Sequence, residues 1–490
     1  MDSFKPMLLT SLKSYDHAQF AKDVTAGIIV AIIALPLSIA LALASGVGPE
    51  AGIFTAIVAG FVISALGGSC VQIAGPTAAF ATIVAGIVAR DGLEGLMTAT
   101  ILAGVFLILM GFCHFGSLIK FIPYTITTGF TSGIAVTIVI GQLKDFCGVT
   151  YPDGVKPIET MEKLKAFAEN FSTISPDALI VGGVSLAILI VSPLIFKKIP
   201  GSLIAVIAGI LMVQFLPLHV STIGNLYTIS NALPTLHLPV FDMKLIQSAI
   251  PNAFTIAVLA AIESLLSCVV ADGMINSKHR SDTELIAQGA GNIASALFGG
   301  IPATGAIART AANIKNGGRT PVAGMVHSIT LVIVLVVLMP FAGMIPMPTI
   351  AAILFLVAYN MCQWRTFVHL VRTAPKSDII VLFTTFVLTV VFDLVVAIEI
   401  GMVLACLLFI KRMSEETHAD SWVYVDDDSP AVDEHLQKLP LEIRVYEITG
   451  PLFFGAADAI EHIVVKDFTK CLVLRMRSVP AIDSTAMNAL

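Results

Sequence analysis

The chain has 490 residues, of which 56% are hydrophobic and only 13% charged, with a formal net charge of −6 at pH 7. Soluble domains are about one quarter charged, so most of this chain is expected to lie in lipid. The net charge argues against nucleic acid as a partner. The seven cysteines are scattered without a C-x-x-C pair, so we expect neither a metal site nor a disulfide framework, and no cofactor.

Apolar runs dominate the chain after a polar N-terminal segment, 1–24. They predict fourteen membrane spans within 25–412, at 25–47, 51–66, 76–90, 93–113, 123–144, 177–196, 202–217, 249–271, 281–299, 306–316, 319–340, 347–363, 378–393 and 395–411. Lysine and arginine gather in alternate loops, on the side of the N-terminus. The positive-inside rule then predicts a multi-pass protein of the cytoplasmic (inner or plasma) membrane with both termini in the cytoplasm.

Two segments with several glycines and a proline interrupt this pattern, at Gly67–Phe80 and Gly299–Asn313. Within a membrane, a broken helix is tolerated only where protein or a wet cavity lines it. Pro76 favours the first turn of a helix, which would direct free N–H groups and partial positive charge back toward Gly75. Such an end is an anion site, and two interrupted segments at corresponding positions of two halves indicate a transporter's binding site. The alternative is a pair of glycine-rich packing contacts or loops.

The composition changes abruptly after Arg412. We interpret the acidic stretch 413–440 as a linker to a small α/β domain at 441–490. Within that domain, strands are expected at Ile443–Ile448 and Cys471–Met476, with a helix at 455–463 between them. A further helix should begin near Ser484, so the domain is expected to be incomplete at Leu490.

Several motifs together resemble the SulP family of anion transporters, the sulfate permease family to which prestin is related. In the first half they are Pro36, Gly46–Ile53 and Gly67–Phe80. In the second half they are Glu263-Ser264, Gly305–Thr310 and Asn313. Near the C-terminus, Pro451–Phe454 and Ile482–Thr485 resemble the family's STAS domain. The resemblance implies an α-helical polytopic membrane protein with fourteen spans in a 7+7 inverted repeat. It also implies two half-helices, core and gate subdomains that move against each other, a homodimer in membrane lipid and a partial cytoplasmic STAS domain.

The resemblance also implies an anion site between the facing N-termini of the third and tenth spans. Some members have a polar side chain where Leu37 stands, so one polar contact of the substrate is unassigned. The residues implied to bind the substrate are Pro36, Leu37, Thr77, Ala78, Gly305, Ala306, Ile307 and Arg309.

Two charged residues within apolar spans carry the functional argument. A carboxylate at membrane depth indicates function by default, and the alternative for Glu263 is a structural partner of Arg309. The family's Na⁺-linked bicarbonate transporters have Asp at the position of Glu263 and a hydroxyl four residues on. Glu263 with Ser267 could therefore take up a proton or bind Na⁺. Arg309 would add to the helix dipole's attraction for an anion, and its alternative is a snorkelling surface arginine.

These observations predict a secondary active transporter and not an enzyme. We expect it to carry a small inorganic or organic anion (bicarbonate, sulfate or a dicarboxylate) by proton-coupled symport with an elevator-like motion. The alternatives are a Na⁺-coupled bicarbonate symporter, an uncoupled channel or exchanger, and, from another class, a membrane-embedded enzyme or sensor. Asp483-Ser484 resembles the phosphorylation-type loop of STAS domains, through which a cytoplasmic regulator would act.

Overall fold

The structure is a computed structural model and describes residues 4–117, 123–152, 157–195, 200–239, 242–392, 394–421, 442–456 and 469–490. The chain divides into two compact units, which we describe separately. The first comprises 1–373 with 382–398, and the second comprises 374–381 with 399–490.

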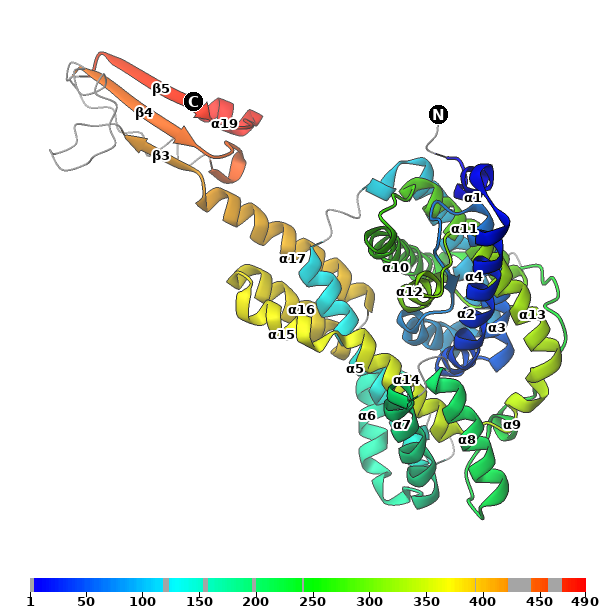
Figure 1. Cartoon of the computed structure of the whole chain (residues 1–490). Coiled ribbons are helices and arrows are strands. Elements are labelled where there is room, and N and C mark those ends of the chain that lie inside the picture. Colours follow the sequence, from blue (N-terminus) through cyan, green and yellow to red (C-terminus); the bar gives the residue numbers. More distant parts are fainter. Residues whose placement is uncertain are drawn as a thin grey trace. The chain divides into compact units, whose positions relative to one another are not determined.

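Helices build the first unit (Figure 1). Eight helical stretches of the described residues are long and apolar enough to cross a membrane: α2 (His17–Ala44), α3 (Pro49–Leu66), α4 (Ala78–Phe112), α5 (Tyr124–Cys147), α7 (Pro176–Ile195), α10 (Met243–Ile275), α13 (Val322–Ala342) and α14 (Met347–Cys362), which α15 (Trp364–Thr373) continues. The shorter helices are α1 (Met7–Ser11), η1 (Leu12–Ser14), α6 (Thr160–Glu169), η3 (Phe171–Thr173), α8 (Gly201–Phe215), α9 (Ile223–Leu226), α11 (Ser281–Leu297) and α12 (Ile307–Lys315). Parts of α16 (Lys376–Val391) and α17 (Leu394–Glu415) belong to each unit.

A helix lies at each of the fourteen positions where a span is predicted. Two predicted spans fall within α4, because Gly92 adopts φ 70° and ψ −167° and breaks the helix there. Only glycine reaches such a conformation at low cost. The count of fourteen spans and the 7+7 repeat stay predictions, since length and composition qualify only eight stretches.

Two groups of helices can be distinguished in the first unit. In one, α4 packs against α10 and α11, α13 packs against α2 and α3, and α12 contacts α10 and α2; in the other, α14 packs against α5 and α7. Glycine allows the closest approach between α4 and α11, because a Cβ at Gly104 would lie 2.6 Å from the carbonyl oxygen of Gly289. Small residues are typical of helix interfaces in membranes, where backbones pack directly.

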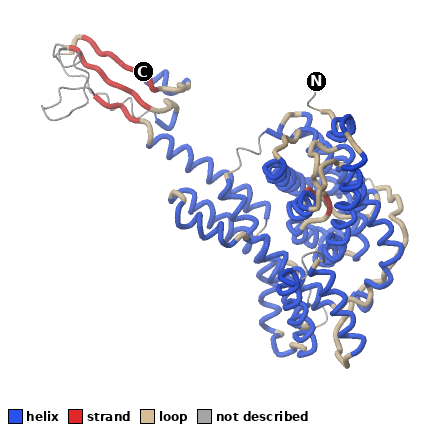
Figure 2. The backbone as a smooth tube through the Cα atoms, viewed as in Figure 1, coloured by secondary structure: helices blue, strands red, loops and turns tan. Residues whose placement is uncertain are grey.

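Two very short strands lie among the helices of the first group (Figure 2). β1 (Ala74–Gly75) pairs antiparallel with β2 (Thr304–Gly305), in the register Ala74 to Gly305 and Gly75 to Thr304. Each strand directly precedes a helix, α4 or α12. The prediction that Pro76 lies in the first helical turn is wrong: α4 begins at Ala78 with Thr77 as its N-cap, because the strand pairing keeps the chain extended through Gly75.

The N-terminal segment 4–16 is tied to the first broken segment. The Met7 N–H donates to the Gly67 carbonyl at 2.8 Å, and Arg280 donates to the Lys5 carbonyl at 2.6 Å. The Tyr15 hydroxyl donates to the buried carboxylate of Asp23 at 3.0 Å. These bonds connect the start of the chain to both α2 and the turn before α11.

The second unit holds a three-stranded sheet in the order β3-β4-β5, formed by β3 (His418–Ser421), β4 (Ile443–Thr449) and β5 (Cys471–Ser478). β4 and β5 are parallel, as a strand–helix–strand unit requires, and both occur where strands are predicted. Ile448 and Leu452 pack with Ala486 of α19 (Ser484–Ala489). The single turn η4 (Phe454–Ala456) follows β4.

The segment predicted as a linker, 413–440, is not all linker. α17 continues to Glu415, and β3 pairs antiparallel with β4, because His418–Ser421 can complete the open edge of the sheet. The rest of that segment, 422–440, and the predicted helix beyond residue 456 lie outside the described residues. Assignment of this unit to the STAS domains stays a prediction.

Candidate functional site

The antiparallel pair β1–β2 brings the two broken segments together. The Ala306 N–H also donates to the Ile73 carbonyl at 2.9 Å, which extends the pairing by one step. We call the residues 73–78 and 304–309 the crossing. The sequence predicts that these segments lie near each other, and the structure adds that their backbones are paired.

Both helices that leave the crossing begin without a side-chain cap. Thr77 precedes α4 and Ala306 precedes α12, and neither side chain accepts a hydrogen bond from the first turn. The first N–H groups of a helix have no intrahelical partner and carry partial positive charge. The crossing therefore presents two helix N-termini with backbone donors, which is an arrangement that suits an anion.

Arg309 places a positive charge at the crossing. Its side chain is only 2% exposed, so the alternative of a snorkelling surface arginine is wrong. Nη2 donates to the Pro76 carbonyl at 3.3 Å and to Ser38 Oγ at 3.4 Å, whereas Nη1 has no hydrogen-bond partner among the described residues. A Cβ at Gly75 would collide with Nη1, so the guanidinium lies directly against β1.

Glu263 of α10 reaches the other helix start. Its Oε2 accepts a hydrogen bond from the Thr77 hydroxyl at 2.9 Å, and the carboxylate is partly buried. No ion pair joins Glu263 to Arg309 within the part of the chain that the structure describes. The structure thus does not support Glu263 as a salt-bridge partner of Arg309 and leaves its charge beside the start of α4.

Ser267 lies near Glu263 in sequence, but its hydroxyl contacts a different group. Ser267 Oγ donates to Thr310 Oγ1 at 3.4 Å, and Thr310 Oγ1 in turn accepts the Ile73 N–H at 3.1 Å. A hydrogen bond to Thr310 of α12 therefore connects Ser267 to the crossing, whereas a hydrogen bond from Thr77 connects Glu263 to it.

The remaining predicted residues surround the same place. Pro36, buried, and Leu37, half-buried, lie in α2 beside Ser38, whose hydroxyl contacts Arg309. Ala78 is buried, whereas Ile307 is 41% exposed at the start of α12.

Further polar side chains satisfy the broken backbone, and of these the sequence argument singled out Asn313 alone. Asn292 of α11 forms two hydrogen bonds with the backbone of Ala303, accepting its N–H and donating to its carbonyl, both at 2.9 Å. Thr55 accepts the Ile301 N–H at 2.7 Å, and Asn313 donates to the Val71 carbonyl at 2.9 Å. Each of these bonds replaces one that a continuous helix would supply. In the sequence, the indication of this role was the presence of polar residues within otherwise apolar spans.

A profile of the sulfate permease family matches residues 20–385, three quarters of the chain. The chain belongs to the sulfate permease family. Its relatives within the family are transporters, so the chain is a multi-pass membrane protein of an anion transporter family and not an enzyme.

Individual relatives match this sulfate permease family member over nearly its whole length. YvdB of Bacillus subtilis, named as a candidate sulfate transporter, is 40% identical over 97% of this chain and 88% of its own. The bicarbonate transporter BicA of Picosynechococcus is 34% identical over 96% of this chain and 85% of its own.

Two solved structures share the fold. The transmembrane domain of a cyanobacterial BicA superimposes with a TM-score of 0.69 at 30% identity, covering 80% of this chain and 98% of that domain. SLC26A9 superimposes with a TM-score of 0.85 at 20% identity, covering 99% of this chain and 83% of its own, which supports the fold alone.

Proposed function

We propose that the chain is a secondary active transporter that carries small anions across the cytoplasmic membrane in symport with protons. The observation that carries this proposal is the crossing, where two uncapped helix N-termini meet around the buried cation Arg309. Backbone N–H groups, dipoles and one guanidinium together select for negative charge and do not demand one shape of anion. Relatives named for sulfate and for bicarbonate agree with that tolerance.

The anion would lie between the two helix starts. Thr77, Ala78, Gly305 and Ala306 would surround it, and the N–H groups in the first turns of α4 and α12 would face it, although the Ala306 N–H itself is bonded to the Ile73 carbonyl. Arg309 would offer its charge. Pro36 and Leu37 of α2 would complete the wall.

Glu263 is the group that we assign to coupling. An anion beside a carboxylate and an arginine is easier to carry through an apolar interface if the carboxylate is neutral, because burying an uncompensated charge is costly. A proton taken up on Glu263 achieves this neutrality. Its single hydrogen bond, from Thr77, leaves room for a second partner at the carboxylate.

Na⁺ coupling is the second candidate, and the oxygen atoms near the crossing favour it. Glu263, Thr77, Ser267 and Thr310 each contribute a side-chain oxygen to the surroundings of the two helix starts. All four, however, are hydrogen-bonded in two pairs, Thr77 to Glu263 and Ser267 to Thr310, and Na⁺ would have to compete with both bonds.

The wider proposals follow the family pattern. The helices around α4 and α12 would move as a core against the α5–α7–α14 group in an elevator-like motion, in a homodimer with both termini in the cytoplasm. The second unit would bind a cytoplasmic regulator.

Uptake of radiolabelled anions into proteoliposomes tests the function. Saturable uptake of bicarbonate, sulfate or a dicarboxylate that an inward proton gradient stimulates without Na⁺ is the expected result. Uptake that requires Na⁺ and does not respond to the proton gradient would show that Na⁺, and not the proton, is the coupling ion. Uptake that never saturates and shows no counterflow would indicate a channel.

The coupling role of Glu263 is tested with Glu263→Gln, which removes the titrating proton but keeps an acceptor for Thr77. The variant is expected to lose stimulation by the proton gradient while retaining anion exchange. Glu94→Gln is the matched control, because Glu94 is an exposed carboxylate of α4. If Glu263→Gln responds to the gradient as fully as the control does, Glu263 does not couple.

A further inference from the structure

Glu284 is a second carboxylate buried within the helices, and the transport scheme above does not use it. It lies in the first turn of α11 and is 1% exposed. Among the described residues it forms no ion pair, so its charge is not compensated by a direct cationic contact. Burying a charged side chain in this way is costly unless hydrogen bonds compensate.

Four neutral donors surround the Glu284 carboxylate. Oε2 accepts the Gly68 N–H at 2.9 Å and the Ser69 N–H at 3.2 Å. Oε1 accepts the Gln72 side-chain amide at 3.0 Å and that of Gln288 at 2.9 Å. A carboxylate has about four lone-pair positions, so the side chain is saturated. Three of the four donors belong to the segment that leads into β1.

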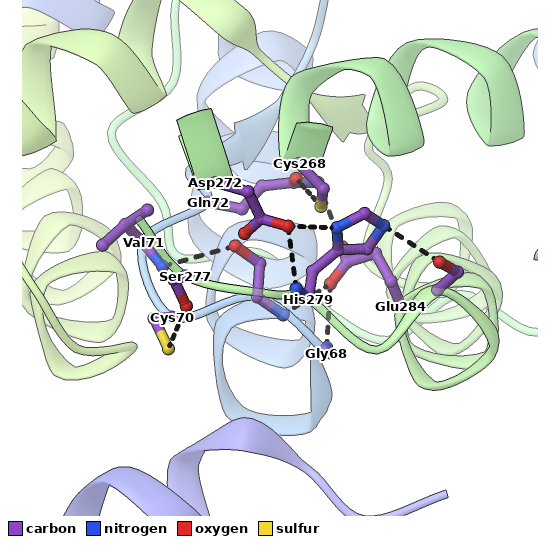
Figure 3. Close-up of polar contacts among 11 residues, drawn as sticks. Gly68, Cys70, Val71, Gln72, Cys268, Asp272, Ser277, His279 and Glu284 are labelled. Carbon is purple, nitrogen blue, oxygen red and sulfur yellow. Dashed lines mark hydrogen bonds and ion pairs between the residues drawn. The ribbon is translucent and has the colours of Figure 1, made fainter. Parts of the chain in front are cut away.

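Gln72 carries this connection on to the crossing. Its Oε1 accepts a hydrogen bond from the Cys268 thiol at 2.6 Å, so its side-chain amide is bonded at both ends, to α11 and to α10 (Figure 3). A Cβ at Gly305 would collide with the same side chain. Gln72 therefore packs directly against the backbone of β2, one residue before Ala306, which precedes α12.

The far end of the same segment is bonded to α12. The Asn313 side chain donates to the Val71 carbonyl, and the Thr310 hydroxyl oxygen accepts the Ile73 N–H. The stretch 68–73 is thus fixed by α11 at its beginning and by α12 at its end, and β1 follows immediately. Its position decides where the start of α4 meets the start of α12.

We propose that Glu284 is a positioning residue for the anion site: through Gln72 and the amides of Gly68 and Ser69, it sets the geometry of the crossing. This proposal rests on the proposed function, because it assumes that the anion binds at the crossing. Glu284 itself contacts no substrate. Its loss should therefore lower the affinity for the anion and leave the number of active transporters largely intact.

The test is the kinetics of anion uptake in proteoliposomes for Glu284→Ala, Glu284→Gln and Gln72→Ala. In Glu284→Ala the KM should rise at least about tenfold, because misplacement of binding groups by as little as about 1 Å is costly. Glu284→Gln keeps one oxygen for Gly68 and Ser69 but turns an NH2 group toward the Gln72 and Gln288 amides, so its KM should lie between those of Glu284→Ala and the unchanged protein. A purely structural defect would lower Vmax through loss of folded protein and would leave KM unchanged.

A double-mutant cycle tests whether Glu284 acts through Gln72. The variant with both alanines should have a KM no higher than the worse single variant, since coupled residues are not additive. Asp282→Ala is the matched control, because Asp282 lies in the same turn of α11 but binds Gly116 and His114. Its KM should equal that of the unchanged protein. Independent, additive effects of Glu284 and Gln72 would overturn the proposed connection.

Hydrogen–deuterium exchange separates failure of this proposal from failure of the proposed function. In Glu284→Ala, the amides of 68–75 and 304–306 should exchange faster than in the unchanged protein, whether or not any anion is carried. If the unchanged protein shows no saturable uptake, the proposed function fails and the exchange result alone decides on Glu284. If uptake is normal, and both KM and exchange of Glu284→Ala are unchanged, Glu284 is not a positioning residue. Should Glu284→Ala fail to fold, Gln72→Ala decides, because an unchanged KM and unchanged exchange in that variant would overturn the proposed connection.

Discussion

At the scale of the residue, the most informative side chain is Arg309. A guanidinium has five N–H donors, and the described contacts use only Nη2, at the long distances of 3.3 and 3.4 Å. A buried cation with unused donors is poorly satisfied until an anion arrives. These unused donors support the proposal that Arg309 binds the anion.

Arg309→Ala is expected to weaken anion affinity by one to two powers of ten, about 1.4–2.8 kcal/mol, as for one charge-assisted contact. Arg309→Lys should retain part of the transport, because it keeps the charge and loses the second donor group. The measurement is the KM of uptake in proteoliposomes. Arg90→Ala serves as the control, since Arg90 is exposed and bonds only to its own helix at Gly86. An alanine variant of Arg309 with an unchanged KM would remove it from the site.

Sequence reasoning reached the two charged residues beside the helix starts and missed the polar side chains of α11. Arg309 and Glu263 stand out because charge is rare within apolar spans. Glu284, Gln288 and Asn292 follow one another at intervals of four, which places them on one face of α11. That polar stripe was visible in the sequence and could have indicated a helix bound to broken backbone. Ser38 and Gln72 give no such pattern, since a lone polar residue in an apolar span is often satisfied by its own helix.

At the scale of the element, the crossing depends on glycine. At Gly75 and Gly305 a side chain would occupy the space taken by Arg309 and Gln72, respectively. The paired strands are only two residues long, too short for any periodic pattern, so their register was beyond prediction from sequence. The interruption of the helices was predictable because Gly-Gly and Pro are frequent helix breakers.

Gly305→Ala is expected to lower transport by more than about tenfold, because the new methyl group must displace Gln72 or separate β1 from β2. Gly273→Ala is the matched control, since a Cβ there would contact nothing within 4 Å. Initial rates in proteoliposomes with equal amounts of folded protein give the comparison. Equal rates for the two variants would mean that the crossing tolerates side chains and does not bind the anion through its backbone.

The second unit offers a prediction that depends on pH. The Asp483 carboxylate accepts the Ala486 N–H at 2.8 Å as the N-cap of α19, and also the Phe454 N–H at 2.9 Å. These bonds, first of all that from Ala486, lower the pKa of Asp483 below its usual range. The stabilisation is therefore complete above the ordinary pKa of Asp and is lost as the pH falls through the lowered value.

We expect Asp483→Ala to increase hydrogen exchange in 442–456 and 484–490 at neutral pH, and to make exchange in these segments less sensitive to acidification. Asp483→Asn, which still caps a helix, should resemble the unchanged chain at neutral pH. Exchange measured by mass spectrometry on the full chain at neutral and acidic pH provides the data. Equal sensitivity to acid in Asp483→Ala and the unchanged chain would contradict the role of this carboxylate.

At the scale of the whole molecule, transport requires groups of helices that stay intact while others move. The backbones of α4 and α11 approach each other at Gly104 and Gly289, where each glycine faces the carbonyl of the other. Such contact leaves little freedom for one helix to slide along the other. Because α4 begins at the crossing and α11 carries Glu284, the crossing and the side chains that support it belong to the same packed group.

Gly289→Leu is expected to destabilise the protein by about 1–3 kcal/mol, since the side chain must separate two backbones in contact. The midpoint of thermal unfolding in detergent should fall accordingly. Gly183→Leu in α7 is the control, because a Cβ at Gly183 meets no atom within 4 Å. A midpoint that falls no further for Gly289→Leu than for the control would show that α4 and α11 can separate at little cost.

The bonds that tie the N-terminal segment to the first broken segment have an optical consequence. Leu9 lies on α1 with half of its side chain exposed, two residues from Met7, whose N–H holds the Gly67 carbonyl. Leu9→Trp would therefore place an indole close to the bond between Met7 and Gly67, outside the crossing. Its emission would report on that bond, so a change when the anion is added would let binding be followed by fluorescence in real time from the very start of the chain.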